Sequence, residues 1–251
     1  MAVYDQNAKF FKSQELSDFT LTCRGTVIPV HRFVLATNST FFRTAFRGNF
    51  KSLMDFPEDD PAILEKVMSI MYRGNYDDVI FGKAQHPHTV TRRPLSTICR
   101  EIRGAVSTGP DEWDTRDRLA ISDVAQVLDN EQETDAVDKI FECLQDSLYI
   151  YILARKIEFP IGEVLAAERF ALVLRNYFDA GQFRDVEIRT FVEFIDELYT
   201  NTPAKAELRL TFCFHFKQFC RRYPAESSKF RKEAAGVLQV HSDFRDDMAR
   251  Y

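Results

Sequence analysis

Candidate zinc ligands occur near residue 215, where two thiols and an imidazole lie close together in the sequence. Cys213, His215 and Cys220 are of the residue types that bind structural zinc. A fourth ligand is missing, and on the Phe-rich helix expected here Cys213 and Cys220 share a face while His215 points elsewhere. Free cysteines are among the most buried residue types, so we interpret both thiols as core residues.

A second pair of candidate ligands, His86 and His88, flanks Pro87. A metal site needs further ligands, and none is spaced to supply them. We interpret this segment as a solvated loop, and we expect the protein to hold no metal and no cofactor.

A basic cluster precedes a serine in the segment Arg92-Arg93-Pro94-Leu95-Ser96. Basic residues before a hydroxyl are typical of kinase targets, and short basic clusters are typical of import signals. Two hypotheses follow, a phosphosite at Ser96 and an import signal.

Short catalytic motifs are missing from the sequence. It contains no Gly-rich phosphate loop, no H-E-x-x-H, no G-x-S-x-G and no C-x-x-C. Pairs of acidic residues are abundant, but on a charged surface such pairs are usually solvated. We therefore expect no enzymatic activity.

The composition is that of a globular protein with an excess of phenylalanine. Hydrophobic residues make up 45% and charged residues 28% of the 251 residues, with 23 Phe against one Trp. So many Phe residues predict a substantial core and an apolar mating surface. The net charge of -5 argues against a dedicated nucleic-acid binder, although it leaves room for a local basic patch.

Cysteine usage and hydropathy bear on the compartment. The five cysteines are irregularly spaced, and no apolar run is long enough to cross a bilayer. The first residues lack the apolar core of a signal peptide. These features predict a reducing intracellular compartment, cytoplasmic and/or nuclear, and no membrane partner.

The elements that must position any site begin with a hairpin and short helices. Residues 19–23 alternate apolar with polar side chains as a half-buried strand does, and Asn38 or Ser39 can cap a helix that ends near Gly48. Asp60 and Pro61 predict the start of a further helix. The expected order is a strand at 19–23, a turn at Arg24-Gly25, a strand at 26–30, helices over 32–36 and 40–46, a strand at 53–57 and a helix over 61–72.

The segment 79–138 differs in character from its surroundings. It has five basic residues against one acidic residue from 83 to 103, and ten acidic residues against two basic ones from 111 to 138. Loops of this length are uncommon inside compact domains, so we interpret the segment as a flexible insertion that holds one helix, at 119–128.

From about residue 137 onward, apolar residues recur at spacings of three and four, which predicts helices. The expected helices run from 137 to 152, from Pro160 to 178, from 186 to 199, from Thr202-Pro203 through the apolar stripe of Leu208, Phe212, Phe216 and Phe219, and from 229 to 249. Together the elements predict a mixed α+β fold with a small sheet and a helical C-terminal half.

Several of these segments, in order, carry a family likeness. The first set resembles the BTB/POZ signature, and a later pair is similar to the form frequent in fungal BTB proteins. The first set is Ser17–Leu21, Gly25, Pro29–Ala36, Ser39, Phe42, Ala45-Phe46 and Gly48–Phe50; the later pair is Glu58–Pro61 and Met71–Tyr76.

The likeness continues into the C-terminal half, where residues 151–160 resemble a helix of the same group and residues 192–203 resemble a helix and turn of its C-terminal extension. Two departures are the long insertion and Lys51-Ser52-Leu53, which stands where the family has Glu-Ser. The resemblance implies an α+β BTB/POZ fold, a small mixed sheet flanked by a cluster of helices. It also implies a stand-alone BTB/POZ domain over 15–178, interrupted by 79–138, with a helical extension over 179–251.

The resemblance implies a protein–protein interaction module, a self-associating adaptor or scaffold. The expected partner is a second copy, as a homodimer, or another BTB protein, with no nucleic acid. One alternative is a substrate adaptor that binds a cullin scaffold of a ubiquitin ligase, and another is a transcription or chromatin cofactor.

The resemblance also suggests site residues. Asp18 and Arg32 match the family's charged-pocket pair near the dimer interface, and His31, Leu35 and Phe42 accompany them. A different interpretation is that Asp18 and Arg32 only hold the hairpin onto the helix. For the cullin alternative, Tyr76 and Asp78 take the positions of an apolar residue and a following Glu, with Asp in place of Glu.

Overall fold

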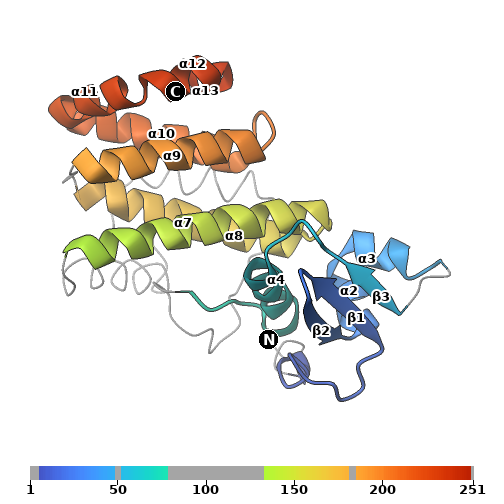
Figure 1. Cartoon of the computed structure of the whole chain (residues 1–251). Helices are drawn as coiled ribbons and strands as arrows, with labels where there is room; N and C mark the ends of the chain where they lie inside the picture. The colour runs from blue at the N-terminus through green and yellow to red at the C-terminus, as the bar shows by residue number, and fades with distance from the viewer. Residues whose placement is uncertain (1–5, 49–51, 79–132, 181–184, 250–251) are drawn as a thin grey trace, which may run out of the picture. The chain divides into compact units, whose positions relative to one another are not determined.

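The computed structural model describes residues 6–48, 52–78, 133–180 and 185–249 (Figure 1). The chain divides into two compact units, Met1–Arg92 with Tyr149–Ala166 and Arg93–Leu148 with Ala167–Tyr251. Two helices, α7 (Glu133–Lys156) and α8 (Pro160–Ala180), contribute residues to both units. The domain boundary expected after residue 178 stays a prediction, and the helix expected at 119–128 lies outside the described residues.

The first unit contains a three-stranded mixed sheet in the order β2-β1-β3. Strand β1 (Phe19–Cys23) pairs antiparallel with β2 (Thr26–Val30) and parallel with β3 (Leu53–Asp55). Arg24 and Gly25 have φ values of 44° and 87° and form the tight hairpin turn expected from the sequence. Strand β3 is shorter than predicted because Phe56 turns into the core and Pro57 has no N–H to donate.

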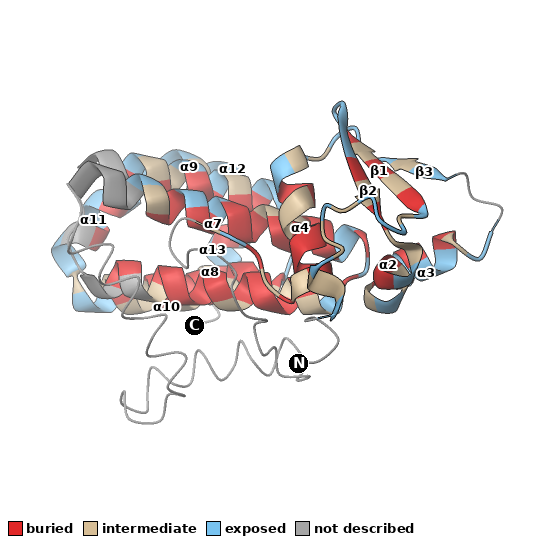
Figure 2. Cartoon of the chain, turned by 90° about the horizontal axis from the view of Figure 1, so that it is seen from below, coloured by how far each residue is buried: buried red, intermediate tan, exposed pale blue. Residues whose placement is uncertain are grey.

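Three helices accompany the sheet: α2 (Arg32–Asn38), α3 (Thr40–Ala45) and α4 (Pro61–Arg73). The side chain of Ser39 caps α3 and that of Asp60 caps α4, as the sequence predicts. Gly74, with a φ of 72°, ends α4 in the left-handed conformation that glycine adopts without strain. The red segments of Figure 2 show that β1, α2 and α4 each turn a buried face inward.

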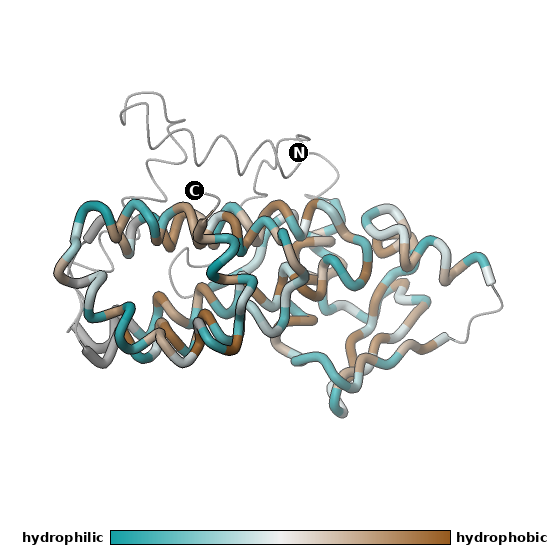
Figure 3. Tube along the Cα trace, turned by 90° about the horizontal axis from the view of Figure 1, so that it is seen from above, coloured by the Kyte–Doolittle hydropathy of each residue, from teal (hydrophilic) through white to brown (hydrophobic). Residues whose placement is uncertain are grey.

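The second unit is helical, and its core is aromatic. Besides parts of α7 and α8 it contains α9 (Asp185–Asn201), α10 (Glu207–Arg222), α11 (Pro224–Glu233), α12 (Ala235–Val240) and α13 (Ser242–Ala249). In Figure 3, hydrophobic and hydrophilic stretches alternate along these helices, as amphipathic packing requires. Phe191 of α9 lies at the centre, with ring centroids within 6.1 Å of its own on Phe141, Tyr177, Phe178, Phe212 and Phe230.

Two predicted helices in this unit are wrong in their bounds. Helix α10 begins at Glu207, because the Thr202 hydroxyl donates to the Leu198 carbonyl at the end of α9 and Lys205 adopts a positive φ of 64°. The single helix expected over 229–249 is three short helices. Pro224 begins the first of them, and His241, with a ψ of 83°, separates the last two.

None of the helices within the described ranges combines the length and hydrophobicity that crossing a membrane requires.

Candidate interaction surface

The loop before α2 is held by a hydrogen-bonded histidine. The His31 backbone N–H donates to the Tyr72 hydroxyl oxygen, and the ring nitrogen Nδ1 lies 2.8 Å from the same oxygen. The other ring nitrogen, Nε2, lies 2.8 Å from the Glu15 carbonyl oxygen. Because a carbonyl only accepts, Nε2 carries the proton of the neutral ring and Nδ1 accepts from the Tyr72 hydroxyl. His31 thus joins the segment before β1 to α4.

Tyr72 is placed so that its hydroxyl stays protonated. The side chain is buried, and this burial raises its pKa to about 12, with the Asp18 charge adding to the effect and the hydrogen bond from His31 opposing it. The hydroxyl can therefore donate to His31 throughout the neutral range.

Removing this hydroxyl is expected to destabilise the first unit. In Tyr72→Phe, the His31 N–H and Nδ1 lose their partner, at a cost of about 1–3 kcal/mol. The wild type should also lose stability as pH rises from 10 toward 12, because the unfolded chain releases the tyrosine proton at a lower pH than the folded chain does. Chemical denaturation across this pH range should show a smaller loss in Tyr72→Phe. Equal losses in both proteins would contradict the assignment.

Asp18 and Arg32 do meet, but through the backbone of one of them. Asp18 Oδ1 accepts from the Arg32 backbone N–H at 2.8 Å, so the carboxylate sits at the first turn of α2, where a negative charge is favourable. The Arg32 guanidinium lies 5.2 Å from the Phe19 ring centroid and 5.4 Å from that of Phe46. Within the described part of the chain, its buried Nε has no hydrogen-bond partner. Asp18 therefore holds the hairpin onto α2.

A buried serine joins α3 to the end of α7. Ser39 Oγ donates to the Ile157 carbonyl and accepts from the Phe42 N–H, while the Thr40 N–H donates to the Glu158 carbonyl. Ser39 has no exposed surface. The start of α3 is thereby fixed on segments far apart in the sequence.

Leu35 and Phe42, predicted at the partner surface, lie in the core with no exposed surface in this chain. The Phe42 ring contacts those of Phe46 and Phe56, at centroid distances of 5.8 and 6.4 Å. In the single chain these two side chains support α2 and α3 from beneath, and their contact with a partner stays a prediction.

Tyr76, predicted at a cullin contact, is also fully buried, whereas Asp78 is half-buried. Ser69 Oγ donates a hydrogen bond to the Asn75 carbonyl, and the side chain of the next residue, Tyr76, is buried in the core. Of the Tyr76–Asp78 pair, only Asp78 reaches the surface. Ser96, His86, His88, Arg92 and Arg93 lie outside the described residues.

The exposed apolar side chains of α2 and α3 are ones that the sequence analysis did not single out. Phe33 of α2 is 72% exposed and Phe41 of α3 is 36% exposed. No Asp or Glu occurs between Asp18 and Asp55, while Arg43 and Arg47 are exposed. We call the exposed side chains of α2 and α3 the α2–α3 surface; it contains two Phe, three Thr and Arg43, and Arg47 lies just beyond α3. The phase of α2 around buried Val34 and Leu35 could have indicated that Phe33 points outward.

The sheet and the helices α2 to α4 all fall within residues 7–86, and these residues match the family model of the BTB/POZ domain. Residues 7–86 form a BTB/POZ domain. Such a domain is a protein–protein interaction module. Two curated proteins that the chain resembles are the Nucleus accumbens-associated protein 2 of rat and that of mouse, each 36% identical over 58 residues. The match covers 23% of this chain and 10% of either relative, so the chain corresponds to a small part of them.

Outside the BTB/POZ domain, the three candidate zinc ligands lie on α10 and differ in burial and contacts. Cys213 has no exposed surface, and its Sγ lies 3.2 Å from the Tyr199 hydroxyl. Burial raises the pKa of this thiol to about 12, which favours the neutral thiol over a metal-binding thiolate. His215 is buried and Cys220 is half-buried.

Proposed function

We propose that the chain is a self-associating adaptor or scaffold that pairs through the α2–α3 surface of its BTB/POZ domain, either with a second copy or with another BTB protein. The observation that carries the proposal is Phe33, a large aromatic side chain left 72% exposed on a short helix. Aromatic residues, Phe among them, are enriched in protein interfaces relative to the rest of the protein surface.

The framework behind Phe33 supports this role. Asp18 holds the first turn of α2, His31 ties the preceding loop to Tyr72, and Ser39 fixes the start of α3. A surface whose backbone is fixed before binding loses little conformational entropy when it binds.

Replacing Phe33 by Asp is expected to weaken self-association by about 2–4 kcal/mol, because a charge would take the place of a buried aromatic anchor. Sedimentation equilibrium of the purified chain over a concentration series measures this directly. Val240→Asp is the matched control, because Val240 is 73% exposed but lies on α12. A wild type that stays monomeric at all concentrations would contradict pairing with itself.

The salt dependence of association distinguishes pairing with a second copy from pairing with another protein. The exposed charges on and next to the α2–α3 surface are those of Arg43 and Arg47, so pairing of two identical copies should strengthen as added salt screens their repulsion. Pairing with an acidic surface of another protein should weaken under the same conditions.

A further inference from the structure

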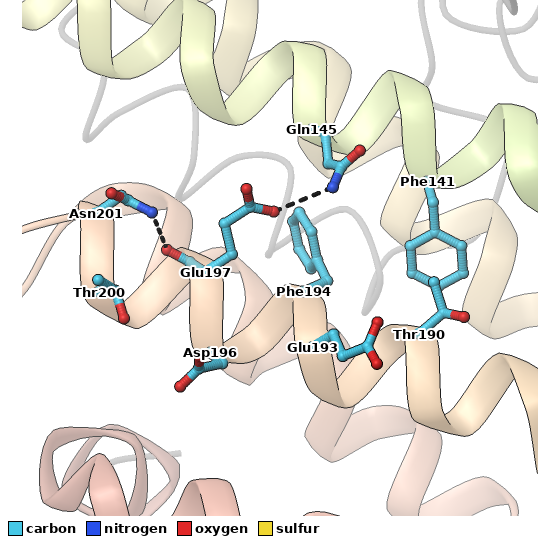
Figure 4. Close-up of a pocket in the computed structure, with 9 residues that line it drawn as sticks. All are labelled: Phe141, Gln145, Thr190, Glu193, Phe194, Asp196, Glu197, Thr200 and Asn201. Carbon is cyan, nitrogen blue, oxygen red and sulfur yellow. Dashed lines mark hydrogen bonds between the residues drawn. The ribbon is translucent and has the colours of Figure 1, made fainter. Parts of the chain in front are cut away.

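A groove lies between α7 and α9, within the second unit. Its volume is about 430 Å³, and the described residues that line it come from these two helices. Phe141 and Gln145 approach it from α7, and the remaining seven follow α9 from Thr190 to Asn201 (Figure 4). The groove takes no part in the BTB/POZ domain at residues 7–86.

We propose that this groove binds an extended, arginine-bearing segment of a partner protein. It would give the chain a second interaction site, separate from the α2–α3 surface, at which an adaptor could hold a client.

The floor of the groove is apolar. The rings of Phe141 and Phe194 lie with their centroids 6.4 Å apart, and Figure 4 shows them extending toward each other from α7 and α9. Both are almost fully buried, at 5% and 2% exposed. The methylene stem of an arginine can lie along such a surface while its charged end stays at the rim.

Among the described residues that line the groove, the charged ones are all carboxylates. Glu197 is held in place by a hydrogen bond of 3.2 Å from Gln145 Nε2, whereas Glu193 is exposed and has no hydrogen bond or ion pair with any described residue. Asp196 is turned to His241, whose Nε2 lies 2.7 Å from Asp196 Oδ1. Glu193 therefore remains to receive a guanidinium group, which binds a carboxylate with two parallel hydrogen bonds, and Glu197 adds its negative charge one helical turn away.

The shape of the groove favours an extended segment over a single small cation. The lining residues of α9 recur at spacings of three and four, so they form one stripe along the helix. From Thr190 to Asn201 this stripe is about 16 Å long at about 1.5 Å per residue. About five residues of extended chain span that length. Thr200 and Asn201 place a hydroxyl and an amide at one end, where they can bond a peptide backbone.

The test uses the full chain and a fluorescein-labelled heptapeptide in which three arginines alternate with leucines. Fluorescence anisotropy should show binding, and the double variant Glu193→Gln/Glu197→Gln should raise the Kd by about tenfold, because it removes the carboxylate that receives the guanidinium and the negative charge beside it. The control is Glu233→Gln/Asp246→Asn, which removes the same charge at exposed positions of α11 and α13 and should change the Kd by less than about twofold.

Three results would overturn the proposal. Equal loss of binding in both double variants would mean general attraction to an acidic protein, and equal binding of the heptapeptide with glutamate in place of arginine would remove the charge argument. A groove variant that lowers the mass of the protein in sedimentation would make the occupant a second copy. None of these results changes the expectation for Phe33→Asp, so the two proposals fail independently.

Discussion

Replacing Arg209 by Ala is expected to lower the free energy of unfolding of the second unit by about 3–5 kcal/mol. Its guanidinium is buried and donates to the Thr202 hydroxyl, to the carbonyls of Tyr199 and Thr202, and to Asp243. It also lies 4.4 Å from the Tyr199 ring centroid. Without it, the two carbonyls at the C-terminal end of α9 would be buried with no donor from position 209.

Hydrogen exchange of the α9 and α10 amides measures the loss of stability in the second unit alone. This method is preferred because a chain of two units need not unfold in a single two-state transition. Arg221→Ala is the matched control, because Arg221 lies on the same helix, is exposed, and should change stability by less than about 0.5 kcal/mol. Arg209→Lys should recover only part of the loss, because an ammonium group cannot reproduce the planar fork. Similar exchange in Arg209→Ala and Arg221→Ala would contradict the role given to Arg209.

The contacts of Arg209 show what the sequence could not supply. The pattern of Leu208, Phe212, Phe216 and Phe219 predicts a helix with an apolar stripe, and α10 has it. Nothing in that pattern indicates that the arginine next to Leu208 is also buried. Its burial depends on the end of α9 and on Asp243 of α13, and pairings across such sequence distances leave no periodic pattern in the sequence.

Elements defined by local chemistry were predictable. The turn at Arg24-Gly25, the Ser39 cap of α3 and the Asp60-Pro61 start of α4 each depend on neighbouring residues only, and the structure confirms them. The start of α10 failed for the opposite reason, because Thr202 bonds back to α9. The order of short strands and helices predicted only a small sheet with helices, whereas the motifs that resemble the BTB/POZ signature predicted the domain that the family model matches.

The candidate site was predicted less well than the fold, because a family motif combines residues of two kinds. Its apolar positions contain both core residues and surface residues, and their identity alone does not separate the two. Leu35 and Phe33 are two residues apart on α2, yet one has no exposed surface and the other is 72% exposed. The helical phase and the packing against the sheet decide between them.

This distinction leads to a sharp expectation for Phe42 and Phe33. Phe42→Ala should destabilise the first unit by about 3–5 kcal/mol, because it leaves a cavity among packed rings, whereas Phe33→Ala should stay within about 0.5 kcal/mol. Hydrogen exchange of the β1 and β2 amides measures both in the unit to which they belong. Association should respond in the opposite order, strongly to Phe33→Ala and, in whatever Phe42→Ala protein remains folded, weakly.

The two readouts together assign each side chain to the core or to the surface. If Phe42→Ala kept its stability and lost association, Phe42 would contact the partner directly, and α3 would have to move on binding to release a side chain that is fully buried here. If Phe33→Ala lost stability, its ring would be part of the core of the folded chain. The expected outcome, stability depending on Phe42 and association on Phe33, requires a surface already formed in the single chain. Partners would then differ in how they contact Phe33, while the Phe42 ring stays in the core.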